Sequence, residues 1–195
     1  MFEVQNLIYV YMTLCFAMMI FNLAYMFYQS SSNKKIQRRN KTLMKRIDVQ
    51  MSLIKNHETI LEIHKSYLYH KLRRVANLCV FEETLEFYSP ELVEVYLAQV
   101  EGVFINLCDV YIKKNSIEKA YFAYLLGKYK VGKKKEILAI TKYLFHMLEE
   151  GSVYCVDNAM TTFYKLGDIE NIVHALFIVD KKELYQNSLV IHKNP

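Results

Sequence analysis

The chain has 195 residues, of which 53% are hydrophobic, and its formal net charge is +5 at neutral pH. Seven basic residues fall within residues 34–46, whereas the chain from residue 47 onward has 18 Lys or Arg against 19 Asp or Glu. This distribution argues against a nucleic-acid-binding domain, which carries its positive excess on the folded part. The first 89 residues contain no Gly and no Pro, which favours long helices over hairpins.

Residues 7–28 form an uncharged run that is long enough for a transmembrane helix. As a helix these 22 residues would extend about 33 Å, compared with about 30 Å for the hydrocarbon core of a bilayer. Tyr9 and Tyr11 lie near one end and Tyr25 and Tyr28 near the other, as expected at the two interfaces. The segment lacks the basic leader and the small-residue cleavage site of a signal peptide. We therefore predict a single-pass anchor, with residues 1–6 outside the cytoplasm.

The basic cluster after this segment sets the predicted orientation. Only one acid precedes the span, so the positive-inside rule places everything after it on the cytoplasmic side of the cell membrane. The same cluster is a candidate for contact with anionic lipid head groups of the bilayer. Its members are Lys34, Lys35, Arg38, Arg39, Lys41, Lys45 and Arg46.

Residues 29–88 are predicted to form the basic juxtamembrane segment and a long linker helix. Apolar residues recur here every seven positions, but the companion positions of a coiled-coil seam are polar. Two interpretations stay open: a parallel dimer, or an amphipathic stalk that docks on its own domain. His57 and His64 have no third metal ligand nearby in sequence and are expected to be solvent-exposed or packing residues. The apolar set is Ile47, Ile54, Leu61, Leu68 and Val75, and the polar set is Gln50, His57, His64 and Lys71.

Residues 89–185 are predicted to form a domain of short helices, followed by a tail over residues 186–195. Ser89 and Pro90 are typical of a helix start, and Ser116 is expected to open the next helix. Gly127, Gly151 and Gly167 are expected to end successive helices. Asp168 then caps a short helix whose inward face includes Ile169, Ile172, Val173 and Leu176, and Ile117 is expected to face inward in its own helix.

These helices are too short to bury their apolar faces in isolated pairs, which is typical of stacked repeats. Ala120 and Ala159 are 39 positions apart, and so are Tyr124 and Phe163. This interval is close to that of HEAT repeats. The predicted fold is all-α: a transmembrane helix, a long linker helix, and a short HEAT-like α-solenoid or a plain helical bundle.

Two stretches, IEKAYFAYLLGKY (117–129) and VYCVDNAMTTFYKLGDIENIVHALFIVD (153–180), resemble Firmicute membrane-anchored proteins with HEAT-like helical repeats. The resemblance implies a bacterial protein in which a span and a basic stretch precede the helical array. It also implies a shortened member, since the group usually continues for several more helices. The matching residues are Tyr154, Cys155, Asn158, Ala159, Gly167, Glu170, Asn171, Ile172, Val173, Ala175 and Leu176.

No enzyme chemistry can be identified in the sequence. Phosphate-loop, dinucleotide-binding, zinc-protease and serine-hydrolase motifs are absent, so no catalytic, cofactor-binding or metal site is expected. The four cysteines lack metal-ligand spacing and are expected to be reduced thiols. One basic turn is a candidate for partner contact, with Lys128, Lys130, Lys133, Lys134 and Lys135.

The resulting functional hypothesis is a membrane-tethered helical-repeat scaffold or accessory subunit that binds another protein at the cytoplasmic face. The family resemblance suggests an envelope-polysaccharide enzyme of the membrane as one candidate partner. The alternative is a dimeric single-pass receptor or stalk protein that signals through its linker helix. Neither hypothesis describes an enzyme or a protein that binds nucleic acid.

Overall fold

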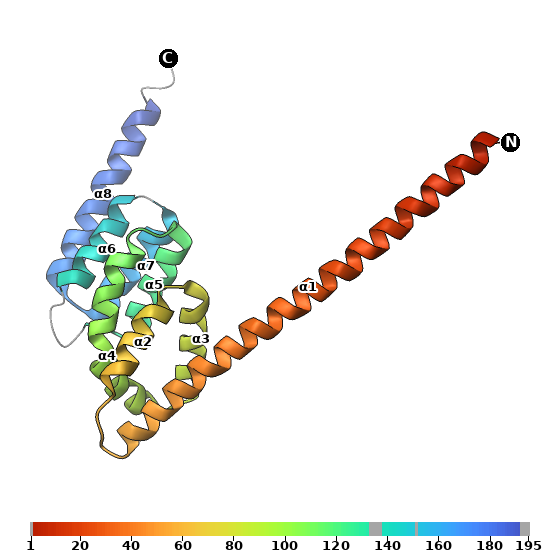
Figure 1. Ribbon diagram of the computed structural model, residues 1–195. Coiled ribbons are helices and arrows are strands. Elements are labelled where there is room, and N and C mark those ends of the chain that lie inside the picture. The colour runs from red at the N-terminus through yellow and green to blue at the C-terminus, as the bar shows by residue number, and fades with distance from the viewer. Residues whose placement is uncertain (1, 133–137, 151, 192–195) are drawn as a thin grey trace. The chain divides into compact units, whose positions relative to one another are not determined.

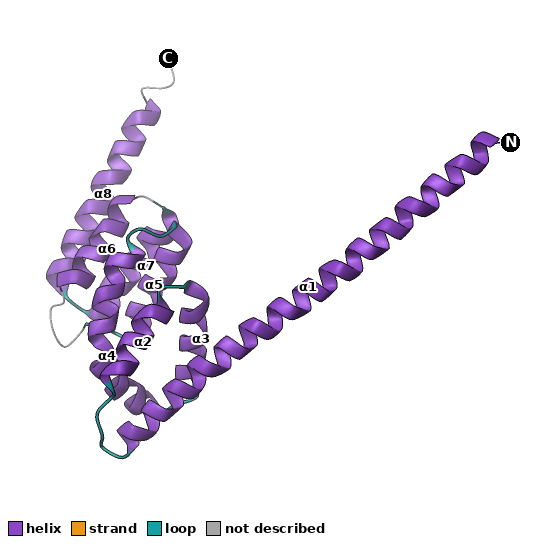
Figure 2. Cartoon of the chain, in the orientation of Figure 1, coloured by secondary structure: helices purple, strands orange, loops and turns teal. Residues whose placement is uncertain are grey.

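The computed structural model describes residues 2–132, 138–150 and 152–191 (Figure 1). Within the helices, the side chains of residues 2–8, 10, 24, 27–39, 150 and 182–191 lie outside the description. The described chain consists of helices and loops and contains no strand, which confirms the all-α prediction (Figure 2). The helices are α1 (Phe2–Lys55), α2 (Glu62–Leu72), α3 (Val75–Leu85), α4 (Pro90–Tyr111), α5 (Ser116–Lys128), α6 (Leu138–Glu150), α7 (Val153–Leu166) and α8 (Ile169–Ile191).

The chain divides into two units, Met1–Thr42 and Leu43–Pro195. The first consists of the N-terminal part of α1. Among the described residues, no helix combines the length and the apolar character that a membrane crossing requires. Residues 7, 8, 10, 24, 27 and 28 of the predicted span lie outside the described side chains.

In the second unit each helix from α4 onward packs against the helix two places before it. Thus α4 packs on α2, α6 on α4 and α8 on α6, while α5 packs on α3 and α7 on α5 (Figure 1). Five described hydrogen bonds join residues that are 39 positions apart in the sequence. In one, the Tyr111 hydroxyl donates to the Leu72 carbonyl at 2.7 Å; in another, the Thr162 hydroxyl donates to the Ala123 carbonyl at 2.8 Å. The sequence interval of 39 is therefore also the interval of tertiary packing.

The expected long linker helix is interrupted. The end of α1 at Lys55 is followed by a connection in which His57 has a left-handed backbone, with φ of 62°. Side-chain amide oxygens accept the backbone N–H groups of this connection. The Ile60 N–H donates to Gln99 Oε1 at 2.8 Å, and the Leu61 N–H donates to Gln50 Oε1 at 3.1 Å. Because Gln99 belongs to α4, residues far along the chain help to end α1.

The seven-residue apolar spacing reflects packing within the second unit. Ile47, Ile54 and Leu68 are buried in its core, together with Leu43 and Met51 from the same part of α1. A further member of the spacing, Leu61, precedes α2 and is 55% exposed. Of the two interpretations of this segment, the arrangement matches docking on the chain's own domain.

Several of the predicted start and end residues of the later helices are confirmed. Helix α4 begins at Pro90, and α7 ends at Gly167, whose φ of 77° suits glycine at a helix C-terminus. Asp168 precedes α8, and its Oδ1 accepts a hydrogen bond from the Asn171 N–H at 3.2 Å. The helix that follows is longer than expected and continues to Ile191.

The predicted inward faces are wrong at several positions. Ile117 is 72% exposed, because the inner face of α5 is formed instead by residues such as Phe122. On α8, Ala175 is buried, while Ile169, Val173 and Leu176 are 76%, 60% and 53% exposed. No helix of the described chain follows α8 to cover that face.

The close approach of α5 and α7 supports a matched pair of glycine substitutions. A Cβ at Gly127 would lie 2.7 Å from Thr162 Oγ1 and 3.1 Å from Thr162 Cα, whereas a Cβ at Gly102 would meet nothing within 4 Å. The Thr162 hydroxyl cannot move freely because it donates to the Ala123 and Asn158 carbonyls. We expect Gly127→Ala to destabilise the protein by about 1–2 kcal/mol, since overpacking outweighs the gain in helix propensity.

For Gly102→Ala we expect stabilisation by about 0.5–1 kcal/mol, because only the helix propensity changes. Thermal denaturation followed by circular dichroism measures both variants. Equal melting temperatures for the two variants would show that the α5–α7 contact is looser than described.

Candidate functional site

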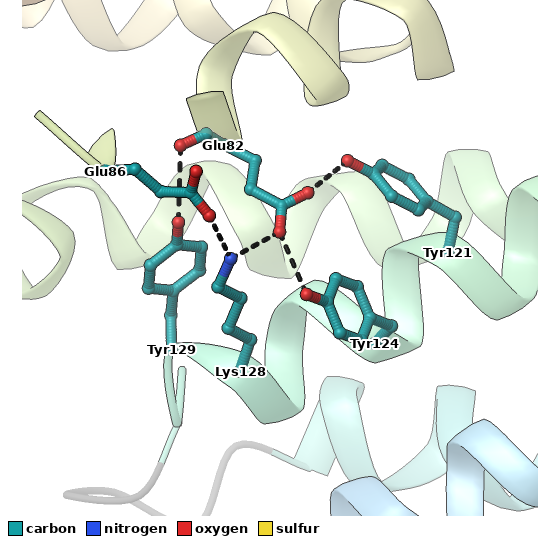
Figure 3. A network of polar contacts seen from close by, with 6 residues as sticks. All are labelled: Glu82, Glu86, Tyr121, Tyr124, Lys128 and Tyr129. Carbon is teal, nitrogen blue, oxygen red and sulfur yellow. Dashed lines mark hydrogen bonds and ion pairs between the residues drawn. The ribbon is translucent and has the colours of Figure 1, made fainter. Parts of the chain in front are cut away.

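A network of polar side chains joins α3 to α5 (Figure 3). The Glu82 carboxylate accepts hydrogen bonds from the hydroxyls of Tyr121 and Tyr124, the latter at 3.0 Å, and forms an ion pair of 2.6 Å with Lys128. Lys128 Nζ also lies 2.7 Å from Glu86 Oε1. The Glu82 carboxylate thus binds three side chains of α5.

Helical spacing explains why these residues meet. Tyr121, Tyr124 and Lys128 recur at intervals of three and four on α5 and therefore share a face. Glu82 lies on α3, and Glu86 is the C-cap residue directly after that helix. The side chain of Glu82 is only 14% exposed, compared with 59% for Glu86. In the sequence, Glu82, Glu83 and Glu86 are expected to lie on one helix and to form a solvated face, and this interpretation is wrong for Glu82. The missed signal was the tyrosines 39 and 42 positions later.

The electrostatics of the network keep its charges fixed around neutral pH. Burial tends to raise the pKa of Glu82, but hydrogen bonds from Lys128, Tyr121 and Tyr124 outweigh it, and the pKa is lowered. Burial and the Glu82 carboxylate raise the pKa of Tyr124. Burial favours a lower pKa for Lys128, yet its bonds to Glu82 and Glu86 raise the pKa overall.

Each of these shifts moves the pKa of its group further from pH 7. A general acid or base works best with a pKa near the working pH, so the network is poorly suited to proton transfer. In addition, no group of His, Cys, Asp or Glu side chains in the described residues has the arrangement of a metal site. The network is best explained as a structural connection between α3 and α5.

A pocket of about 620 Å³ lies beside this network. Its apolar lining includes Leu85, Val93, Leu97 and Val131, and the charged residues at its wall include Glu86 and Lys128. Glu94, Glu101 and Lys130 also line the pocket, so its wall combines apolar and charged side chains. Such a pocket can hold a side chain that has both an apolar and a polar part.

The predicted basic turn is only partly available for contact with a partner. Lys128 belongs to the network, whereas Lys130 is exposed and has a left-handed backbone with φ of 50°. Lys133, Lys134 and Lys135 lie outside the described residues. Lys128 is therefore better explained as a structural residue than as a contact residue.

The juxtamembrane cluster is described only at its end. Lys41, Lys45 and Arg46 are exposed, and the guanidinium of Arg46 lies 4.1 Å from the centre of the Tyr67 ring. The side chains of Lys34, Lys35, Arg38 and Arg39 lie outside the description.

Of the two roles that the sequence left open for His64, the structure shows a buried packing residue. Its Nε2 lies 2.9 Å from the Tyr96 hydroxyl, and only 4% of the residue is exposed. Burial, followed by the charge of Arg46, lowers the pKa of His64 to about 4. His57, by contrast, is exposed.

The lowered pKa of His64 predicts a loss of stability in mild acid. Between pH 6.5 and about 4 the unfolded chain binds a proton at this histidine and the folded chain does not, so the free energy of unfolding falls as pH falls. The loss reaches up to about 3 kcal/mol by pH 4. It is measured as the difference between the wild type and His64→Gln in denaturation curves across this pH range. Parallel curves would mean that the pKa of His64 is the same in the folded and the unfolded chain.

None of the four cysteines is in a disulfide in the structure, and Cys108 and Cys155 are buried. Comparison with known proteins adds no assignment, because no family model, curated protein or solved structure matches the chain.

Proposed function

We propose that the protein is a membrane-tethered scaffold or accessory subunit whose helical repeats bind another protein at the cytoplasmic face of the membrane. The candidate partner suggested by the family resemblance is an envelope-polysaccharide enzyme. The proposal has three parts, the repeat array, the anchor and the binding surface, and each has its own support.

The repeated packing is the observation that carries the proposal. Hydrogen bonds between residues 39 positions apart join α2 to α4, α3 to α5 and α5 to α7, and α6 packs in turn on α4. A regular stack of helix pairs is the arrangement of a HEAT-like α-solenoid, whose repeats are about 40–47 residues long. Solenoids present extended surfaces to other proteins, and the polar network found here lacks groups suited to catalysis.

The anchor is supported by the uncharged run over residues 7–28 and by the exposure of its side chains. All thirteen residues from 11 to 23 are exposed, which is more than three turns of helix and therefore every side of it. Exposed apolar residues on every side of a helix call for an apolar surrounding, and a bilayer provides one.

The binding surface is supported by the uncovered face of α8. Val173, Leu176 and Phe177 are 60%, 53% and 66% exposed, and Ile169 extends the same stripe. Contiguous apolar surface of this kind marks sites of protein interaction. The alternative, a dimeric receptor or stalk, has less support, because Ile47, Ile54 and Leu68 are buried inside the unit.

The test has two steps on the full-length protein. Protease added to spheroplasts should leave the domain after the span intact, because that domain lies inside the cell. Chemical cross-linking in the native membrane, followed by purification in detergent, should then retain a specific membrane protein. Digestion of the domain would reverse the topology, and purification without any partner would contradict the scaffold.

A matched pair of variants tests the α8 face. Val173→Glu with Phe177→Glu is expected to release the partner while the melting temperature stays the same. The control is Ile117→Glu with Val153→Glu, because these residues are just as exposed, at 72% and 79%, but lie elsewhere. Equal loss of the partner in both double variants would remove the special role of α8.

A further inference from the structure

The chain has a second charged surface, formed by Arg46 of α1, Lys71 at the end of α2, and Arg73 and Arg74 in the α2–α3 turn. We propose that this α2–α3 basic surface binds an acidic segment of the partner protein. The inference rests on the proposed function, because it specifies the chemistry of that function's partner. The proposed surface includes Lys71, Arg73 and Arg74, which lie outside the basic cluster of residues 34–46.

Tertiary packing brings Arg46 and Lys71 together, and a second tyrosine contacts Arg73. The Arg46 guanidinium and the Lys71 amine lie 4.1 Å and 5.5 Å from the centre of the same ring, that of Tyr67. Arg73 lies 5.9 Å from the centre of the Tyr69 ring. Cation–π contacts of this kind orient the charges without neutralising them.

No ion pair among the described residues neutralises the surface. None of its four cations belongs to an ion pair in the described chain, and residues 63–81 contain no Asp or Glu. The unit is polarised as a whole: residues 43–81 have 7 Lys or Arg against 3 Asp or Glu, and residues 82–195 have 13 against 16. The positive potential is therefore concentrated at one end of the helical array.

The position of Arg74 is unfavourable for the fold. It is the N-cap residue of α3, where its side chain makes no capping hydrogen bond, and the first turn of α3 contains no acid. A cation at this position is repelled by the positive end of the helix dipole. Residues that break a local rule without a compensating contact tend to occur at functional sites, which favours a binding role for Arg74.

The neighbouring side chains favour a protein partner over a lipid surface. Ile63 and Leu61 are 78% and 55% exposed at the start of α2, and Tyr67 and Tyr69 lie among the cations. Arginine and aromatic side chains beside apolar residues are enriched in protein interfaces. An acidic segment with apolar residues complements this combination.

The first experiment measures binding of labelled poly-L-glutamate to the full-length protein in phosphatidylcholine nanodiscs at low ionic strength. We expect Lys71→Gln, Arg73→Gln and Arg74→Gln together to weaken binding about tenfold, as for loss of several charge contacts. The control replaces three other exposed lysines, Lys113, Lys142 and Lys181, by Gln and has the same net charge. It should bind within about twofold of the wild type, since overall charge alone is not the cause.

Two further comparisons separate a site from a general effect. Arg73→Lys with Arg74→Lys keeps the charge and should retain most of the binding, and its circular dichroism melt verifies that the fold is intact. Equal weakening in both triple variants, or no binding by the wild type, overturns the proposal. So does patch-dependent binding to vesicles of phosphatidylcholine with about one third phosphatidylglycerol that exceeds binding to poly-L-glutamate, because the partner would then be lipid.

Repeating the membrane cross-linking with both triple variants distinguishes this inference from the proposed function. Loss of the partner only in the α2–α3 variant supports both. Equal retention in the two variants leaves the scaffold standing and overturns this surface. Binding of poly-L-glutamate without any cross-linked partner overturns the scaffold and leaves the acidic-segment site supported.

Discussion

Replacing Ile47 by Asp is expected to unfold the second unit. Ile47 lies in α1 and is completely buried in the core. The substitution removes about 1.5–3 kcal/mol of apolar burial and adds several kcal/mol for an unpaired buried charge. The sum is about 5 kcal/mol or more, which is comparable to the whole stability of a typical domain, about 5–15 kcal/mol.

Val49→Asp is the matched control, because Val49 lies on the same helix and is 56% exposed. Its effect should stay within about 0.5–1 kcal/mol, as for most surface sites. Both variants can be compared by urea denaturation of a chain that begins at residue 41. Similar transitions for the two variants would show that the end of α1 is not part of the core.

The same packing determines where a soluble fragment must begin. A fragment that starts at residue 66 loses Leu43, Ile47, Met51 and Ile54 and also divides α2, so its core is incomplete. We expect that fragment to be partly unfolded, whereas the fragment from residue 41 should be helical and cooperative. Each lost side chain contributes about 1.5–3 kcal/mol of burial, which explains the size of the difference.

Replacing Phe163 by Ala is the second large change, with an expected destabilisation of about 3–5 kcal/mol. Phe163 is 1% exposed on α7, and its ring centre lies 4.9 Å from that of Phe145 on α6. Removing the ring leaves a cavity between α6 and α7, which the neighbouring helices cannot fill without moving. Thermal denaturation measures the loss.

Tyr164→Ala serves as the control, because Tyr164 is the next residue along the helix and is 78% exposed. It should melt close to the wild type. If Phe163→Ala also melts like the wild type, the pairing of α6 with α7 is wrong, and the assignment of repeats fails with it.

The sequence was most informative where helix ends have local chemical signals. Pro90 starts α4, Gly167 ends α7, and Asp168 caps the start of α8, because a fixed proline φ, a left-handed glycine and a short acceptor side chain act within a few residues. The 39-residue interval was likewise visible in the spacing of Ala120 and Ala159. For these features, local conformation and periodicity are sufficient.

Side-chain partners that are distant in sequence could not be inferred in this way. Glu82 was expected to face water, and its burial depends on Tyr121, Tyr124 and Lys128 arriving from α5. His64 is buried because Tyr96 of α4 lies against it. A polar residue on a helix has no local signal that tells a solvated face from a satisfied buried one.

The sequence by itself determined that the chain is helical, that its charge and its uncharged run are concentrated near the N-terminus, and that its later helices recur at a fixed interval. These properties follow from composition, spacing and capping chemistry. Only the tertiary structure decided that α1 ends at Lys55, because the amides of Gln50 and Gln99 accept the N–H groups of the following connection. It also decided that Arg46 and Lys71 share one tyrosine ring and that Ile117 and Leu176 face outward. The physical reason is that burial depends on which helices pack together, and this choice is made by contacts across about 39 residues.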